Sequence, residues 1–352
     1  NAPLPSARQI REAPDTLVDH PIGTGPYTFV EWARGEKIEF TAFPEWWGNT
    51  YPEAALGAQS IQDVTYIWRP ESSVRAAQVI AGEAQLGRFL SPEDCATTPA
   101  CKEAISVETV PLRLDTVYPV LNDIRVRKAI TYAIDKQAVV DELFASGAVA
   151  NQLVGPSATG YNAEMAQTPY DPDLARQLVA EAAADGVPVE LPLIIAVRQG
   201  VYLRAEELGE YVAGALNEIG LNATTEVIEY AAYMEQYIMP VDEIPEDRGW
   251  IGTMSHGNEM MDVGLTAATW YRCAGGVASY CDPELDKLIE AANPLVGEER
   301  AAAFAEITRR FQEAYTVVPI LHLAFLYGTA ANLAWEPRLD GFMLVKEMSL
   351  AS

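Results

Sequence analysis

The segment from Gly249 to Cys281 holds the side chains best suited to binding a small ligand. It reads GWIGTMSHGNEMMDVGLTAATWYRCAGGVASYC and mixes aromatic, charged and amide groups without a regular period. Its first residues end a predicted strand, and in open α/β sheets ligands bind where loops follow the carboxyl ends of strands. A solvated loop with a few buried aromatic rings is the alternative. We predict a ligand-binding loop with seven candidate residues: Trp250, His256, Asn258, Glu259, Asp262, Trp270 and Arg272.

The chemistry expected of this loop is binding rather than catalysis. The three histidines, His20, His256 and His322, lie far apart, and none has the spacing of zinc ligands. Ser255 precedes His256 directly, but neighbouring side chains point apart and the chain has no GxSxG motif. Carboxylate pairs are so common in this chain that none indicates a glycosidase. We expect no metal, no cofactor and no enzyme activity, with a secreted hydrolase as the alternative.

The four cysteines form two local pairs, Cys95 with Cys101 and Cys273 with Cys281. Neither pair has the CxxC spacing of a zinc or redox site. Two short loops closed by disulfides are the simplest explanation, and free thiols are the alternative. Disulfides persist in oxidising compartments, so the pattern favours the periplasm or the cell exterior.

The charge of the chain argues against several classes of partner. Its 352 residues carry 50 acidic and 24 basic side chains, a formal charge of −26. Such a chain repels nucleic acid and anionic membrane surfaces. No apolar run reaches the roughly 18 residues of a membrane span. The first residues, NAPLPSARQIRE, lack the pattern of a signal peptide, so we expect a front that is processed or truncated.

The elements that would position the loop are those of an α/β protein. Val189 to Val197, Tyr202 to Ile219 and Ala223 to Ile228 read as strand, helix and strand, which predicts a parallel or mixed sheet covered by helices. A capped helix is predicted from Asn122 to Leu143, after an extended stretch that has the features of a hinge. The strand from Val317 to Leu326 is the expected second passage between lobes.

Five segments together resemble a known family. They are PIGTGPYTFVEWARGEKIEF, FPEWWGN, VIAGEAQLG, NDIRVRKAITYAIDKQAVV and YDPDLARQLVAEAAADG. Their sequences and order are similar to the dipeptide, oligopeptide and nickel-binding proteins of bacterial ABC importers, the extracellular solute-binding proteins of family 5. The resemblance implies an α/β, two-lobed periplasmic-binding-protein fold of type II-like topology, with mixed sheets flanked by helices and a two-strand hinge. We expect residues 1–118 plus 325–352 in the first lobe and residues 119–324 in the second.

The resemblance also implies a function. Such a protein is an extracytoplasmic receptor, secreted or lipid-anchored, that closes its lobes on a peptide or other small solute and delivers it to a membrane permease. In peptide-binding relatives an aspartate of the loop pairs with the amino group of the ligand, which points to Asp262, with Glu259 second. GNEMMD stands in place of their DPD-like sequence. Relatives also have a substantial portion before GTGPY, so we expect an incomplete first lobe that a missing segment or a second chain completes.

Overall fold

The computed structural model describes residues 5–51 and 61–351. The chain forms two compact units, which we call unit 1 and unit 2. Unit 1 consists of residues 1–104 and 325–352, and unit 2 of residues 105–324. Unit 2 is therefore inserted between two segments of unit 1.

The chain passes between the units inside two strands, β5 (Ala100–Leu114) and β11 (Val317–Thr329). The lobes predicted from the sequence place the first passage after residue 118. The compact units instead divide within β5, because the second half of this strand is buried and pairs with a strand of unit 2. A boundary after residue 118 would separate β5 from that partner.

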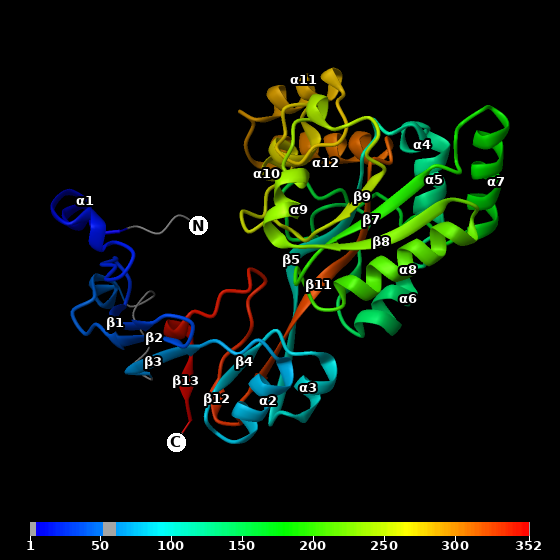
Figure 1. The fold of residues 1–352 in the computed structure, drawn as a ribbon. Coiled ribbons are helices and arrows are strands. Elements are labelled where there is room, and N and C mark those ends of the chain that lie inside the picture. Colours follow the sequence, from blue (N-terminus) through cyan, green and yellow to red (C-terminus); the bar gives the residue numbers. More distant parts are fainter. Residues whose placement is uncertain (1–4, 52–60, 352) are drawn as a thin grey trace. The chain divides into compact units, whose positions relative to one another are not determined.

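Unit 2 is built on a mixed sheet flanked by helices (Figure 1). Its strands follow the order β11-β5-β9-β7-β8, and β4 of unit 1 pairs with the far end of β11. The strands β7, β8 and β9 run parallel to one another, whereas β5 runs antiparallel to β9. The elements of unit 2 besides β5 and β11 are α4 (Pro119–Asn122), α5 (Ile124–Tyr132), α6 (Lys136–Ala138), β6 (Ala148–Val149), α7 (Pro172–Ala184), β7 (Pro192–Arg198), α8 (Ala205–Glu218), β8 (Asn222–Ile228), α9 (Tyr230–Tyr237), β9 (Trp250–Thr253), β10 (His256–Gly257), α10 (Val263–Thr266), α11 (Pro283–Ala292) and α12 (Gly297–Gln312).

The predicted strand–helix–strand unit is present as β7, α8 and β8. Leu193, Ile195, Ala196 and Val197 of β7 are buried, and α8 packs against β7 and β8. The helix begins after the predicted Tyr202, because residues 199–204 form a loop between β7 and α8. This loop follows the carboxyl end of β7.

The predicted helix from Asn122 to Leu143 is broken into shorter pieces. Asp123 caps α5 by accepting a hydrogen bond from the Arg125 amide at 2.8 Å. Asp135 then caps α6 by accepting from the Ala138 amide at 3.0 Å, and a π-helix follows over Val139–Phe144. A side chain that bonds to the backbone in this way ends one helix and begins the next. The sequence does not show this break, because the helical spacing of the apolar residues continues across it.

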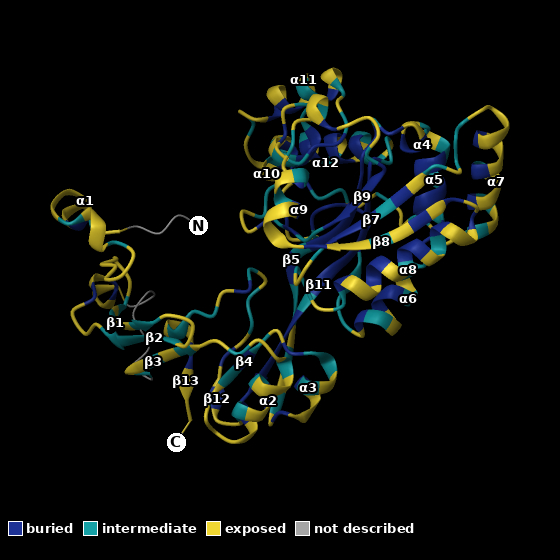
Figure 2. Ribbon diagram, in the orientation of Figure 1, coloured by how far each residue is buried: buried dark blue, intermediate teal, exposed yellow. Residues whose placement is uncertain are grey.

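Unit 1 contains a three-stranded antiparallel sheet, β1-β2-β3, and a small helical part. The predicted hairpin forms around Gly35, whose φ of 79° is easily adopted by glycine. Every residue of these three strands is exposed or half-buried, in contrast to the buried strands of unit 2 (Figure 2). The elements of unit 1 besides the ends of β5 and β11 are α1 (Ala7–Glu12), β1 (Tyr27–Ala33), β2 (Lys37–Ala42), β3 (Asp63–Ile67), α2 (Ser72–Ile80), β4 (Leu86–Arg88), α3 (Pro92–Thr97), β12 (Leu333–Ala334) and β13 (Ser349–Leu350).

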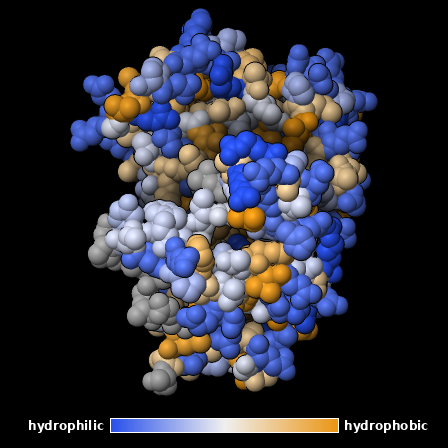
Figure 3. Space-filling model, turned by 90° about the vertical axis from the view of Figure 1, so that its left-hand side faces the viewer, coloured by the Kyte–Doolittle hydropathy of each residue, from blue (hydrophilic) through white to orange (hydrophobic). Residues whose placement is uncertain are grey.

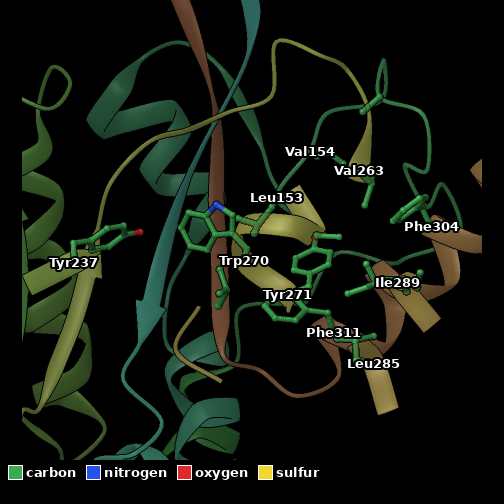
Figure 4. Packing of buried hydrophobic residues seen from close by; sticks show 14 of the residues in the cluster. Leu153, Val154, Tyr237, Val263, Trp270, Tyr271, Leu285, Ile289, Phe304 and Phe311 are labelled. Carbon is green, nitrogen blue, oxygen red and sulfur yellow. The ribbon is translucent and has the colours of Figure 1, made fainter. Parts of the chain in front are cut away.

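An aromatic cluster forms much of the core of unit 2 beneath the predicted loop (Figure 4). The rings of Tyr271 and Phe311 stack with their centroids 4.0 Å apart, and Phe304 and Trp270 belong to the same cluster. A stacked pair contributes about 1 kcal/mol beyond the burial of its surface. Helices α10, α11 and α12 are thereby fixed to the sheet.

Both predicted disulfides are formed. Cys95 and Cys101 are joined in unit 1 with an S–S distance of 2.00 Å, and Cys273 and Cys281 in unit 2 with 2.05 Å. The described helices, in residues 5–51 and 61–351, are all too short or too polar to cross a membrane. Hydrophilic residues cover most of the face seen in Figure 3, as expected for a chain with a charge of −26.

Candidate functional site

The carboxyl ends of β7, β8 and β9 meet at one edge of the unit 2 sheet. Arg198 at the end of β7 is in register with Ile228 at the end of β8, and Val197 is in register with Thr253 at the end of β9. Parallel strands that end together leave a crevice for ligands between the loops that follow them. We therefore take this edge as the candidate site.

Two tyrosine hydroxyls hold the end of β9 in place. The Tyr202 hydroxyl lies 2.5 Å from Thr253 Oγ1, and the Tyr233 hydroxyl donates a hydrogen bond to the Thr253 carbonyl oxygen at 3.0 Å. Burial raises the pKa of both phenols, so they remain protonated donors. The loop after β7 and the helix α9 are thus both fixed to the end of β9.

Arg198 is a cationic group at this edge, and Glu229 follows β8 at the same edge. Its guanidinium carbon lies 5.1 Å from the ring centroid of the exposed Tyr230. Its Nε atom is buried and has no hydrogen-bond partner among the residues that the structure describes. A guanidinium beside an exposed aromatic ring is suited to binding a carboxylate.

A buried cluster of charged side chains holds α9 against the sheet. Asp115 is fully buried and accepts from Arg248 Nε at 2.7 Å and from Arg113 Nη2 at 3.2 Å. The two arginines also donate to the last carbonyl groups of α9, Arg113 to Tyr237 at 2.6 Å and Arg248 to Gln236 at 2.8 Å. This cluster ties α9 to β5 and to the start of β9, which fixes the helix that carries Tyr230 and Tyr233.

The loop predicted from the sequence is held by His256. Trp270 Nε1 donates to His256 Nδ1 at 3.0 Å, so the proton of the neutral ring lies on Nε2, which is 2.7 Å from Thr266 Oγ1. Burial lowers the pKa of His256 to about 4. The imidazole is therefore neutral near pH 7, with both nitrogens already bonded inside unit 2.

Asn258 closes the turn that follows. Its side-chain amide donates to the Asp262 carbonyl oxygen and to Thr266 Oγ1, both at 2.9 Å, and accepts from the Asp262 amide at 3.2 Å. Its own backbone amide donates to the Val107 carbonyl oxygen of β5 at 3.2 Å. Asn258 is almost fully buried, so these bonds replace bonds to water.

Asp262 is bonded to Arg300 of α12. Arg300 Nη2 donates to Oδ1 at 2.7 Å and Arg300 Nε to Oδ2 at 2.8 Å, and Oδ1 also caps α10 by accepting from the Gly264 amide at 2.7 Å. The hydrogen bonds from Arg300 hold the pKa of Asp262 below its usual value. Its negative charge is thus balanced within unit 2.

The structure brings four of the seven predicted site residues into one network: His256, Asn258, Asp262 and Trp270. Trp250 is buried and stacks on Tyr233 with centroids 5.7 Å apart. Arg272 pairs with Glu290 of α11 at 2.9 Å, and Glu259 is exposed.

The sequence analysis missed Arg198, Tyr202 and Tyr230. A signal for Arg198 was present, because it is a charged residue directly after an apolar strand. Its relation to Thr253 depends on the pairing of β7 with β9, which local sequence does not report. Among the described residues, no group of three or more histidine, cysteine or acidic side chains is arranged to hold a metal ion.

Unit 1 contains an apolar pocket of about 330 Å³. Two hydroxyls at its wall are already used, since Tyr27 donates to the Ile61 carbonyl oxygen and Tyr66 to that of Met343. Ligand sites combine apolar walls with polar groups that orient the ligand, and the edge in unit 2 offers such a group in Arg198. The pocket is lined by Pro26, Tyr27, Phe40, Trp46, Val64, Tyr66, Met343, Leu344, Val345 and Lys346.

Comparison with known proteins agrees with this fold. A family model described as bacterial extracellular solute-binding proteins, family 5 middle, matches residues 2–265. The chain is 28% identical over 230 residues to the dipeptide-binding protein of Escherichia coli K12, a match that covers 63% of this chain and 41% of that protein. The matched residues thus span less than half the length of that relative.

Two solved structures show the same fold. The substrate binding protein CtaP of Listeria monocytogenes matches with a TM-score of 0.81 and 19% identity, over 99% of this chain and 71% of that one. The periplasmic binding protein DppA of Helicobacter pylori, in complex with the peptide STSA, matches with a TM-score of 0.76 and 18% identity, over 97% and 66%. These matches confirm the predicted α/β fold.

Proposed function

Since the chain belongs to the bacterial extracellular solute-binding proteins of family 5, we propose that it is an extracytoplasmic receptor for a peptide or another small solute. The receptor delivers this solute to the permease of an ABC importer and does not transform it. Membership of a family of extracellular proteins and the two disulfides support a periplasmic or extracellular location. No observation favours the alternative of a secreted hydrolase.

Arg198 is the observation that carries the proposal. It places a guanidinium at the carboxyl edge of three parallel strands, beside the exposed ring of Tyr230. A carboxylate is the group that a guanidinium binds best. We propose that the solute presents a carboxylate to Arg198, as a peptide does with its C-terminus.

The candidate residues of the loop remain a prediction. Asp262 meets the amino group of a ligand only by sharing its carboxylate with Arg300 or by leaving it. Glu259 is exposed, so a ligand reaches it without breaking that ion pair. Of the two carboxylates, Glu259 is therefore the better placed to bind an ammonium group.

Calorimetric titration of the full chain with the peptide Ser-Thr-Ser-Ala tests the proposal. We expect saturable binding, recovery of the intact peptide by mass spectrometry, and weaker binding of the same peptide with an amidated C-terminus. Arg198→Gln should weaken binding of the free acid roughly 10- to 100-fold, the value of a hydrogen bond to a charged group.

Arg176→Gln is the matched control, because Arg176 is an exposed arginine of α7 that pairs with Asp173 of the same helix. It makes the same change of charge and should leave binding unchanged. Equal weakening in both variants would assign the effect to net charge. Cleaved peptide would support the hydrolase, and absence of binding to the peptide would contradict a peptide receptor.

A further inference from the structure

Phe89 in unit 1 adopts a backbone conformation that bulky residues avoid. It follows β4 directly and has a φ of 54°, in the left-handed region. An aromatic residue with this φ carries a cost in free energy, and such residues concentrate at functional sites. The side chain is 38% exposed, so burial of the ring explains little of why this residue occupies a strained position.

Arg75 of α2 enforces this conformation. Its guanidinium donates to the Arg88 carbonyl oxygen at 2.9 Å and to that of Phe89 at 2.7 Å. It also donates to the carbonyl oxygens of Arg69 and Pro70, both at 2.6 Å. One half-buried arginine head group thus fixes the turn on both sides, and the backbone that carries the Phe89 ring is held in place by the protein itself.

Arg88 lies on the face of the ring that this turn presents. Its guanidinium carbon is 3.9 Å from the Phe89 centroid and 5.7 Å from that of Phe325, and the two rings meet edge to face at 4.7 Å. The Arg88 Nε atom is buried and has no hydrogen-bond partner in the described part of the chain, while the guanidinium interacts with the Tyr327 hydroxyl.

The backbone at Gly341 lies close to the Phe325 ring and the Arg88 guanidinium. A Cβ atom there would lie 2.7 Å from Phe325 Cε2 and 3.2 Å from Arg88 Nη2. The residue also has a φ of 69°, which glycine adopts without strain. The backbone therefore supports the two rings and the guanidinium from behind without a side chain between them.

We propose that Arg88 and Phe89 form a binding site in unit 1 for a carboxylate carried next to an apolar or aromatic group. The guanidinium supplies N–H donors to the carboxylate, and the fixed ring of Phe89 packs against the neighbouring apolar group. An arginine stacked on a ring is held in one orientation, which lowers the entropy lost on binding. The proposed function assigns the carboxylate of the solute to Arg198 of unit 2. This site goes beyond it, because Arg88 and Phe89 belong to unit 1.

Benzoate and benzamide are matched probes for this site, since they share a ring and differ in charge. Saturation-transfer NMR of the full chain should show saturable binding of benzoate and much weaker binding of benzamide. Arg88→Gln should weaken benzoate binding about tenfold or more. Phe89→Asn should weaken it as well while keeping the left-handed backbone, because asparagine tolerates this conformation.

Arg69→Gln is the control for the change of charge, because only the backbone carbonyl of Arg69 holds the turn. It should bind benzoate as the wild type does. Thermal unfolding within a few degrees of the wild type shows that each variant is folded. A Phe89→Leu variant keeps an apolar side chain and should retain more binding than Phe89→Asn.

The site is disproved if the wild type does not bind benzoate, or if Arg88→Gln and Phe89→Asn both bind it unchanged. Benzoate binding that disappears in Arg198→Gln but persists in Arg88→Gln also overturns it, because the carboxylate then binds only in unit 2. Titration with Ser-Thr-Ser-Ala tests the proposed function separately. Failure of one titration leaves the result of the other intact.

Discussion

His256 and His322 are histidines that the fold keeps uncharged. Burial lowers the pKa of each to about 4. His322 Nδ1 lies 2.8 Å from Thr109 Oγ1, and His256 is bonded to Trp270 and Thr266. A second proton on His256 would point an N–H group at the N–H group of Trp270. Protonation therefore requires the surroundings of the ring to open.

We expect the protein to lose stability as the pH falls from about 6.5 to about 4. An unfolded chain protonates its histidines near pH 6.5, whereas the folded chain holds these two neutral until about pH 4. Between these values the unfolded state binds more protons, so the free energy of unfolding falls with pH, by up to about 3 kcal/mol for each histidine. Urea unfolding at pH 7 and at pH 4.5 measures the change.

His256→Gln separates this effect from the titration of carboxylates. The variant loses hydrogen bonds at both pH values, but its stability should depend less on pH than that of the wild type. His20→Gln is the matched control, because His20 is exposed. An identical pH dependence in His256→Gln and wild type would show that His256 is not the titrating group.

At the scale of elements, α6 begins with a buried lysine. Lys136 is 6% exposed, and its Nζ atom makes a single long bond, 3.4 Å, to the Ala150 carbonyl oxygen. Burial lowers the pKa of Lys136 to about 8. The helix therefore places a cation in the core that forms no ion pair with a carboxylate in residues 5–51 and 61–351, which is costly.

We expect Lys136→Met to stabilise the protein at pH 7, by up to about 3 kcal/mol. The amine is charged in both states below about pH 8, and the cost of burying it lowers stability there. Stability of the wild type should rise between pH 8 and about 10.5, where the unfolded state binds more protons. Thermal unfolding across this range measures both effects.

Lys287→Met serves as the control, because Lys287 is exposed on α11 and pairs with Glu284. It should change stability little at either pH. A Lys136→Met variant that is less stable than the wild type at pH 7 would mean that the bond to Ala150 outweighs the cost of burial.

The elements themselves could largely be predicted from the sequence, but their pairing could not. Apolar runs ended by glycine report local structure, and they located β7, α8 and β8 to within a few residues. The break before α6 was missed because the apolar spacing continues across it. The pairing of Leu112 with Thr253 joins distant parts of the chain, so the site at the end of β9 could not be assembled from local patterns.

For the same reason, the sequence shows that the loop is polar and aromatic. It does not show which groups the side chains of the loop bind. Histidine and aspartate, the residue types at positions 256 and 262, can bind a ligand or another side chain of the protein equally well. Trp270 becomes the partner of His256, and Arg300 of α12 the partner of Asp262, only when these segments pack together in the fold. A local sequence pattern does not reveal hydrogen-bond partners that come from distant parts of the chain.

At the scale of the whole molecule, the insertion of unit 2 makes a separable fragment possible. Residues 105–324 contain the buried half of β5, which pairs with β9 through Leu112 and Arg113. A fragment that begins at residue 119 lacks this strand and the buried Arg113 and Asp115. It would leave one side of β9 unpaired.

We expect the fragment 105–324 to unfold in one cooperative transition, and the fragment 119–324 to be much less stable or unfolded at room temperature. The physical reason is the loss of the β5–β9 pairing and of a buried ion pair, since removing one partner of such a pair costs about 3–5 kcal/mol. Circular dichroism during heating of both fragments measures the difference. Equal stability would contradict the boundary at residue 105.

The insertion of unit 2 into the sequence of unit 1 also gives an order of events as the chain emerges from export. A chain that is exported from its amino end delivers residues 105–324 before it delivers the segment from Phe325 to Ser352. The inserted unit can therefore acquire its structure while its host is still unfinished, because domains fold as their chain becomes available. The strand β11 belongs to both units. Its first half completes unit 2, and its second half pairs with β4 in unit 1.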